Sequence, residues 1–264
     1  MQETVWHRFR RWSPSPLVRA SLALHGIGAA ALAAAPGYWP GVLGALVLDH
    51  AVLASGMRPR SAMLGRNLCR LDGVSGHVAL TFDDGPDPDV TPRVLDLLDA
   101  HGAKASFFLI GARAERHPEL VREILRRGHG VENHTHSHSM AFACLGIGGQ
   151  WREIDRAQRA IENACGCAPR YFRAPLGIRN PLLDPVLAAA GLDLVSWTRR
   201  GYDTMRHPPE TVIARLTDGL AAGDILLLHD GRAARRMAGN PAVLEILPGL
   251  LHRIAGAGLT ARAL

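Results

Sequence analysis

The first part of the chain is dominated by apolar residues, which form an almost unbroken stretch over positions 20–57. Only His25, Asp49 and His50 interrupt this stretch, and a Pro-Gly-Tyr-Trp-Pro segment at 36–40 divides it in two. Proline and glycine together end helices and make turns. The pattern therefore predicts two short hydrophobic helices that form a hairpin.

From His77 to the C-terminus, short apolar runs alternate with longer segments of helical periodicity. The predicted strands lie near 77–82, 105–110, 130–134, 170–174, 192–198, 224–229 and 259–263. The predicted helices lie at 91–101, 113–128, 151–164, 181–190, 209–222 and 241–256. This rhythm is typical of a parallel sheet with crossover helices. So many β/α units in so short a region predict a small or incomplete α/β barrel.

The charge along the chain divides at the same place as its hydropathy. The whole chain carries a formal net charge of +6. Its first seventy residues hold eight arginines and two acidic residues and therefore account for all of this charge. The rest of the chain has 22 basic and 22 acidic residues. The second part is therefore formally neutral and has no basic stripe, which argues against nucleic-acid binding. The four cysteines are unevenly spaced and fit free thiols better than a disulfide framework or a zinc knuckle.

Polar side chains stand where four of the predicted strands stop. The apolar runs lead into Asp-Asp-Gly-Pro at 83–86, His-Thr-His-Ser-His at 134–138, Arg-Ala-Pro at 173–175 and His-Asp at 229–230. A barrel carries its chemistry at this end of its strands. Two adjacent carboxylates point in different directions, so one can bind a cation while the other faces a substrate. Two histidines and one aspartate would leave a coordination position open for water, as in catalytic zinc sites.

These residues belong to four motifs: TFDDGP at 81–86, HTHSH at 134–138, RAPLG at 173–177 and LLLHD at 226–230. In this order and at these separations they resemble the carbohydrate esterase family 4 polysaccharide deacetylases, whose domain is also called the NodB-homology fold. The resemblance covers the chain from about residue 77 to the C-terminus and leaves out the first seventy residues. It implies an irregular (β/α)7 TIM-like barrel, here preceded by the hydrophobic helical hairpin.

The resemblance also implies a metal site and a general base. Asp84, His134 and His138 would bind a divalent cation, with Zn²⁺ as the expected ion. Asp83 would take a proton from the cation-activated water as that water attacks the acetamide carbonyl. Arg173 would pair with Asp83.

On the opposite side of the implied site, His229 would protonate the departing amine, and an acidic neighbour would raise its pKa. Asp203 takes that role by the resemblance, and Thr204 stands where the family commonly has an aromatic residue. A tryptophan and a leucine at strand ends fit a buried core equally well. The implied substrate-binding residues are Pro175, Leu176 with its neighbouring backbone N–H as oxyanion donor, and Trp197 and Leu227 as the pocket for the acetyl methyl group.

The predicted reaction is removal of the N-acetyl group from an N-acetylhexosamine unit of a glycan, an oligosaccharide or a lipid-linked sugar, with release of acetate. Two alternatives would use the same residues. The fold also hosts amidohydrolases of small cyclic amides or ureides, which fold alone does not separate from deacetylases. The non-enzymatic alternative is a catalytically silent, metal-binding membrane-associated protein. The presence of both Asp83 and His229 argues against it.

Residues 1–70 are expected to form a membrane-associated basic and hydrophobic hairpin, and residues 71–264 the catalytic domain. Each apolar half is somewhat shorter than the ~20 residues that span a bilayer, and Asp49 is costly at mid-membrane. Arginines flank both ends, and basic flanks prefer the cytoplasmic side, so an inner-membrane hairpin with a cytoplasmic catalytic domain fits best. The alternatives are a signal peptide that exports the enzyme to the periplasm and a soluble hairpin packed on the domain.

Overall fold

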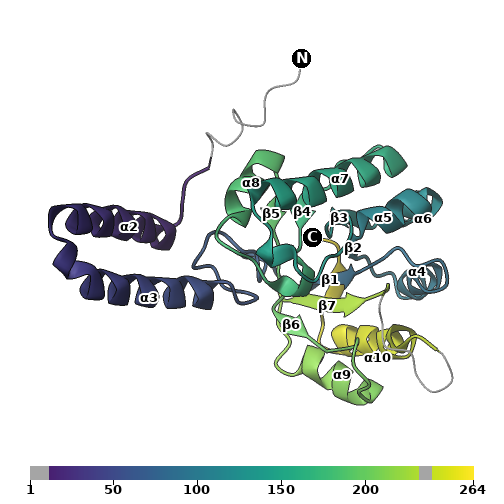
Figure 1. Cartoon of the computed structure of the whole chain (residues 1–264). Helices are drawn as coiled ribbons and strands as arrows, with labels where there is room; N and C mark the ends of the chain where they lie inside the picture. The colour runs from purple at the N-terminus through teal and green to yellow at the C-terminus, as the bar shows by residue number, and fades with distance from the viewer. Residues whose placement is uncertain (1–11, 232–239) are drawn as a thin grey trace.

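The computed structural model describes residues 12–231 and 240–264, which form an α/β body and a projecting helical hairpin (Figure 1). The hairpin consists of α2 Pro16–Ala34, η2 Pro36–Tyr38 and α3 Trp39–Gly56. The strands of the body are β1 His77–Asp83, β2 Ser106–Leu109, β3 Gly130–Asn133, β4 Tyr171–Phe172, β5 Asp193–Leu194, β6 Arg199–Arg200, β7 Ile225–His229 and β8 Thr260–Arg262. Its helices are α4 Thr91–Ala100, α5 Gly111–Arg116, α6 Pro118–Arg126, α7 Ile147–Cys165, α8 Leu183–Ala190, α9 Pro209–Thr217 and α10 Ala242–Gly256, with short 3-10 turns η3 Phe142–Cys144 and η4 Pro175–Gly177.

The strands form one curled parallel sheet in the order β5-β4-β3-β2-β1-β7-β6, with β8 paired to the start of β1. The register puts Asp83, the last residue of β1, opposite Phe108 of β2 and His229, the last residue of β7. Because all the strands run the same way, their C-terminal ends and the polar residues that follow them meet at one rim. This arrangement confirms the predicted irregular TIM-like barrel behind an N-terminal hairpin.

The central strand β1 shows how the sequence pattern builds this rim. Leu80 and Phe82 point outward into the main hydrophobic core, which the covering helices complete. The alternate residues, Ala79, Thr81 and Asp83, point to the barrel interior, as the two-residue period of a strand requires. The inward face therefore changes from apolar to charged as the strand approaches the rim, so the carboxylate emerges where the barrel opens.

The structure differs from two of the predicted elements. The single strand predicted at 192–198 is wrong, because β5 ends at Leu194 and β6 begins at Arg199. Between them the chain pairs first with Leu68, through a bridge to Val195, and then passes to the far edge of β7. The single helix predicted at 113–128 is also wrong: it is two helices, and the second, α6, begins at Pro118, which has no N–H to continue the first.

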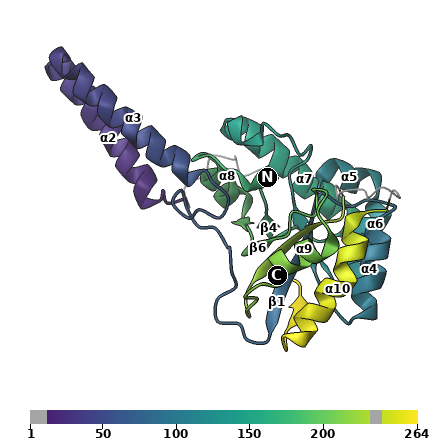
Figure 2. The same cartoon turned by 90° about the horizontal axis from the view of Figure 1, so that it is seen from below.

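The helices α2 and α3 pack on each other and extend away from the body in both views (Figures 1 and 2). The stretches Pro16–Ala34 and Pro36–Gly56 are long and apolar enough to cross a membrane, and only 17% and 6% of them are buried. Leu22 and Leu48 are exposed along the helices, and Tyr38 and Trp39 at the turn. The predicted pair of helices is confirmed, and it does not lie packed on the domain. The arginines at 8–11 lie outside the described residues.

The segment that follows the hairpin, residues 57–71, is fixed to the body by Arg179, which is only 2% exposed. Its Nη2 donates to the carbonyl oxygens of Gly65 and Ser61 at 2.9 and 3.2 Å. Its Nη1 pairs with Asp184 at 3.1 Å. Arg179 stands two residues beyond the RAPLG motif, so the base of the hairpin is joined directly to the rim of the barrel.

Replacing Arg179 by alanine is therefore expected to destabilise the protein strongly. The variant leaves the Gly65 carbonyl and the largely buried Asp184 carboxylate without their donor, which should lower the free energy of unfolding by about 3 kcal/mol or more. Urea unfolding of the full-length protein in detergent measures this change. The control is Arg159→Ala, which breaks an exposed pair with Asp155 on α7 and should cost less than about 1 kcal/mol. Equal, small effects of the two variants would contradict the proposed role of Arg179 as the link.

Candidate active site

Asp83 ends β1 inside the barrel, where the guanidinium of Arg173 holds it. Nη1 of Arg173 donates to Asp83 Oδ1 at 2.6 Å and to the Thr81 hydroxyl at 3.0 Å. Nη2 donates to the Ser196 carbonyl at 2.9 Å, and the guanidinium stacks 4.0 Å from the centre of the Phe108 ring. Burial lowers the pKa of Arg173, and the Asp83 charge opposes that shift. These contacts fix one carboxylate oxygen of Asp83 and leave Oδ2 free of the arginine.

The backbone of Arg173 also orients His134, which follows β3. The Arg173 carbonyl accepts a hydrogen bond from His134 Nδ1 at 2.8 Å. Since a carbonyl only accepts, Nδ1 carries the proton, and the lone pair of the neutral ring lies on Nε2. This Nε2 lies 3.5 Å from Asp84 Oδ1 and 3.8 Å from Asp83 Oδ2, and His138 Nε2 lies 3.1 Å from Asp84 Oδ1.

The buried carboxylate of Asp84 has the features of a metal ligand. The residue has a backbone φ of 74°, a left-handed conformation that ends the extended strand β1. Its buried Oδ1 has no hydrogen-bond partner among the described residues, although the two imidazole nitrogens lie close to it. Ligand atoms of Asp84, His134 and His138 all lie within 4.8 Å of one another. Two ring nitrogens and one carboxylate oxygen are a donor set that suits Zn²⁺, so the residues fit the ion.

The electrostatics of this group also favour a cation. Burial alone would raise the pKa of Asp84, but the neighbouring His134 and His138 hold it below its usual range. Burial would lower the pKa of His134, and the Asp83 and Asp84 charges raise it instead. The carboxylates thus favour a positive charge at Nε2 of His134, which is either a proton or, on the neutral ring, a metal cation.

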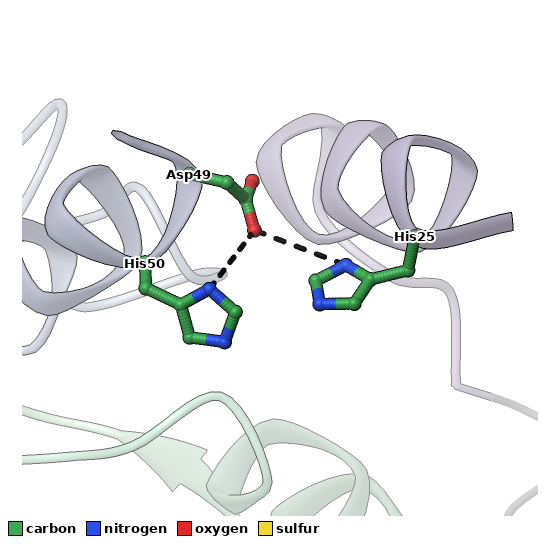
Figure 3. A group of neighbouring side chains, drawn as sticks. All are labelled: His25, Asp49 and His50. Atoms are coloured by element: carbon green, nitrogen blue, oxygen red, sulfur yellow. Dashed lines mark ion pairs between the residues drawn. The ribbon is translucent and has the colours of Figure 1, made fainter. Parts of the chain in front are cut away.

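A second group with the same residue types lies in the hairpin, where His25 faces Asp49 and His50 (Figure 3). Figure 3 shows the two Nδ1 atoms turned to Asp49, at 4.0 and 3.9 Å from Oδ2. These Nδ1 atoms already donate to the carbonyls of Ser21 and Leu46, both at 2.8 Å, and Asp49 accepts from the Ser21 hydroxyl at 2.7 Å. The atoms that face Asp49 are therefore engaged. The group joins α2 to α3 and does not fit a metal ion in this arrangement.

His229 ends β7 on the other side of the candidate metal site, and Asp203 holds it. His229 Nδ1 lies 2.9 Å from Asp203 Oδ1, and the His229 backbone N–H donates to Oδ2 at 2.7 Å. Asp203 is fully buried. Burial of His229 opposes its charged form, but the Asp203 carboxylate outweighs it and raises the pKa of His229 to about 9. The imidazolium is thus a proton donor near neutral pH, with Nε2 left for the cavity.

One cavity of about 250 Å³ joins these groups. It is lined by Asp83, Asp84, His134, His138 and His229, and by three of the predicted substrate-binding residues, Leu176, Trp197 and Leu227. Leu176 has a φ of 58°, and among the described residues its N–H has no acceptor, which leaves it available to an oxyanion. Pro175 is the exception: it is buried at the start of η4 and is not among the residues that line the cavity. Arg173 and Asp203 do not line the cavity; they contact Asp83 and His229 from behind its wall.

Four further residues line this cavity and were not predicted as site residues: Met140, Gly177, Arg200 and Thr204. Gly177 is the last residue of the RAPLG motif, so the motif could have marked it. The structure shows why the position requires glycine: its φ is 72°, and the Trp197 ring lies 2.5 Å from the place of a Cβ. Thr204 follows Asp203 directly, so the same turn brings it to the cavity wall. Met140 and Arg200 carry no pattern of spacing that marks them.

Asp230, the last residue of the LLLHD motif, supports the turn that carries Asp84. It is buried and accepts a hydrogen bond from the Thr91 hydroxyl at 2.5 Å. Its carboxylate fills the place of a Cβ on Gly85, 2.4 Å away, so the position after Asp84 requires glycine. Burial, together with the charges of Asp84 and Asp87, raises the pKa of Asp230 to about 7. Asp230 thus positions the turn from below the site.

The sequence is similar to known deacetylases over most of the body. The family model for polysaccharide deacetylase matches residues 72–195. A chitooligosaccharide deacetylase of Sinorhizobium fredii is 40% identical over 166 residues, which are 62% of this chain and 77% of that protein. A peptidoglycan-N-acetylglucosamine deacetylase of Bacillus cereus is 37% identical over 175 residues, 66% of this chain and 81% of that protein.

The fold agrees with these similarities. The structure of a family 4 carbohydrate esterase from Streptomyces lividans in complex with acetate superposes with a TM-score of 0.64 at 33% identity, covering 71% of this chain and 92% of that one. The residues matched by the family model hold three of the four motifs, TFDDGP, HTHSH and RAPLG. The chain therefore belongs to the polysaccharide deacetylases of carbohydrate esterase family 4, the NodB-homology hydrolases that deacetylate N-acetylated sugars.

Proposed function

We propose that this protein is a metal-dependent N-deacetylase that removes the acetyl group from an N-acetylhexosamine unit of a glycan, an oligosaccharide or a lipid-linked sugar and releases acetate. The observation that carries this proposal is that a single cavity is lined by a fitting set of metal ligands, by Asp83 on one side and by His229 on the other. The names of relatives that act on chitooligosaccharides and peptidoglycan support a sugar as the substrate.

The cation, with Zn²⁺ as the proposed ion, would supply Lewis acidity at Asp84, His134 and His138. Asp83 is the general base and takes the proton of the attacking water on Oδ2, the oxygen that Arg173 leaves free. The Leu176 N–H donates to the carbonyl oxygen of the acetamide as negative charge develops there.

The proposed acid step uses His229. Its Nε2 gives a proton to the amine nitrogen as the carbon–nitrogen bond breaks, while Asp203 holds Nδ1 and keeps the ring in place. Trp197 and Leu227, both buried in the cavity wall, accept the acetyl methyl group. An amidohydrolase of small cyclic amides or ureides would use the same residues, so a substrate profile separates it from the proposed function.

We also propose that residues 1–70 form a membrane-associated hairpin and residues 71–264 the catalytic domain. The two apolar helices support membrane insertion by their length and exposure, and the arginines at 58–70 favour a cytoplasmic catalytic domain. The alternative is export to the periplasm behind a signal sequence. A lipid-linked sugar fits the proposed arrangement, because the link through Arg179 would hold the cavity next to the base of the hairpin.

The proposed function predicts that the zinc-loaded, full-length protein releases acetate from chitooligosaccharides, peptidoglycan fragments or lipid-linked N-acetylhexosamines. Asp83→Asn should lower kcat by about 10² to 10⁴-fold with zinc retained, because the base is lost and the ligands remain. Asp84→Asn should lose the zinc, and the hairpin variant Asp49→Asn should keep it. Acetate assays and elemental analysis measure both effects. No acetate from any N-acetylated sugar, or full activity of Asp83→Asn, would contradict the proposal.

The pairing of His229 with Asp203 predicts a pH dependence. The acid must be protonated, so kcat/KM should fall as the pH rises through about 9, the raised pKa of His229. Asp203→Asn removes the largest raising interaction, so this fall should move to lower pH by about 1 to 3 units. The exposed Asp218→Asn serves as the control and should leave the profile unchanged. A profile of Asp203→Asn that matches the wild type would show that another group is the acid.

The proposed topology predicts that protease added to spheroplasts leaves the catalytic domain intact. Because the domain would face the cytoplasm, cleavage should occur only after the membrane is permeabilised. Immunoblotting of the C-terminal domain before and after permeabilisation measures this. Cleavage in intact spheroplasts would favour the exported, periplasmic alternative.

A further inference from the structure

Arg200, the last residue of β6, lines the same cavity as the proposed base and metal ligands. It pairs in register with Leu227 of β7, so it stands beside the proposed pocket for the acetyl methyl group. Its guanidinium carbon lies 5.3 Å from the centre of the Trp197 ring and 4.9 Å from that of Tyr202. The two aromatic contacts hold the cation in a fixed place on the cavity wall.

Within the described residues, the side chain of Arg200 has no ion pair and no hydrogen bond, and its enclosed Nε has no acceptor. The carboxylates of the site are already engaged, Asp83 by Arg173 and Asp203 by His229. Arg199 provides the contrast, because its Nε pairs with the buried Asp224 at 2.5 Å. Of two adjacent arginines, one is thus satisfied by the fold and the other is stacked, accessible and without an anionic partner.

A guanidinium with free donors in a fixed plane is suited to bind a pair of anionic oxygens, because it can donate two parallel charge-assisted hydrogen bonds. We infer that Arg200 is an anion-binding residue of the substrate cavity, so that the substrate carries a negatively charged group beside its acetylated sugar. This inference rests on the proposed deacetylation and adds the charge of its substrate. A phosphate ester and a sugar carboxylate both present this chemistry.

The chain at the base of the hairpin brings more positive charge near the same wall. Pro59 lies 3.0 Å from the place of a Cβ on Gly177, which lines the cavity. The residues on both sides of it, Arg58 and Arg60, are exposed. A negatively charged sugar would thus approach the cavity past basic residues, and its anionic group would give Arg200 the partner that the fold does not supply.

The test compares three substrates of the full-length, zinc-loaded protein: the neutral methyl glycoside of N-acetylglucosamine, N-acetylglucosamine 1-phosphate and N-acetylmuramic acid. The wild type should show a kcat/KM at least about tenfold higher for one anionic substrate than for the neutral one. Arg200→Gln should lower this ratio by about 10- to 100-fold, and Arg200→Lys should retain part of it. The substrate that loses its advantage identifies phosphate or carboxylate as the group bound.

The ratio of kcat/KM for an anionic substrate to that for the neutral one separates anion binding from packing. Loss of packing on Trp197 would lower kcat/KM for all three substrates together and leave this ratio unchanged. The matched control is Arg215→Gln: Arg215 stacks on the other ring, Tyr202, at 5.6 Å but does not line the cavity, so the ratio should stay within about twofold. A wild-type ratio near one, or an equal loss on all three substrates in Arg200→Gln, overturns the anion-binding role and leaves the deacetylase proposal standing.

Absence of acetate from every N-acetylated sugar would overturn the deacetylase proposal instead. Binding then still decides the role of Arg200. Titration calorimetry of N-acetylglucosamine 1-phosphate and N-acetylmuramic acid with the Asp83→Asn protein, with and without Arg200→Gln, should show affinity for one of them that is at least about tenfold weaker without the arginine. Equal affinities of the two proteins for both ligands would overturn the inference.

Discussion

The buried ion pair between Arg173 and Asp83 organises the rest of the site. The Arg173 guanidinium reaches from Asp83 at the end of β1 to the Ser196 carbonyl, between β5 and β6, and the backbone carbonyl of the same residue holds the ring of His134. One residue thus orients the proposed base and a proposed ligand together. A charge that is 1% exposed is tolerated because Asp83 pairs with it. The distance between base and cation site is therefore set by the fold before any substrate arrives.

The sequence predicted most of this fold because strands such as β1 and β7 are apolar runs that stop at a charged residue. The strand predicted at 192–198 failed because that run crosses from one edge of the sheet to the other, a change of partner that leaves no mark on hydropathy. Most of the predicted site residues come together because they follow strand ends. Arg200 could not be found in this way, because in sequence it is indistinguishable from Arg199, and only their partners separate the two.

The hairpin and the barrel are coupled through the segment at 57–71. Arg179 holds that segment, and Pro59 touches the wall of the cavity at Gly177. The same exposed apolar helices that are long enough to cross a membrane are thus joined to the loop that lines the proposed site. We propose that this coupling keeps the cavity near a membrane surface, where a lipid-linked sugar would be found, and that Arg200 favours a substrate with a negative charge.

The buried group at the strand ends, and not the group in the hairpin, is the proposed site of the catalytic metal. Anomalous diffraction at the zinc absorption edge, from crystals of the zinc-loaded full-length protein, locates the ion. One strong peak is expected within bonding distance of Asp84, His134 and His138, beside Asp83. A structure with no peak there, or with its zinc bound by His25, Asp49 and His50, would contradict this proposal.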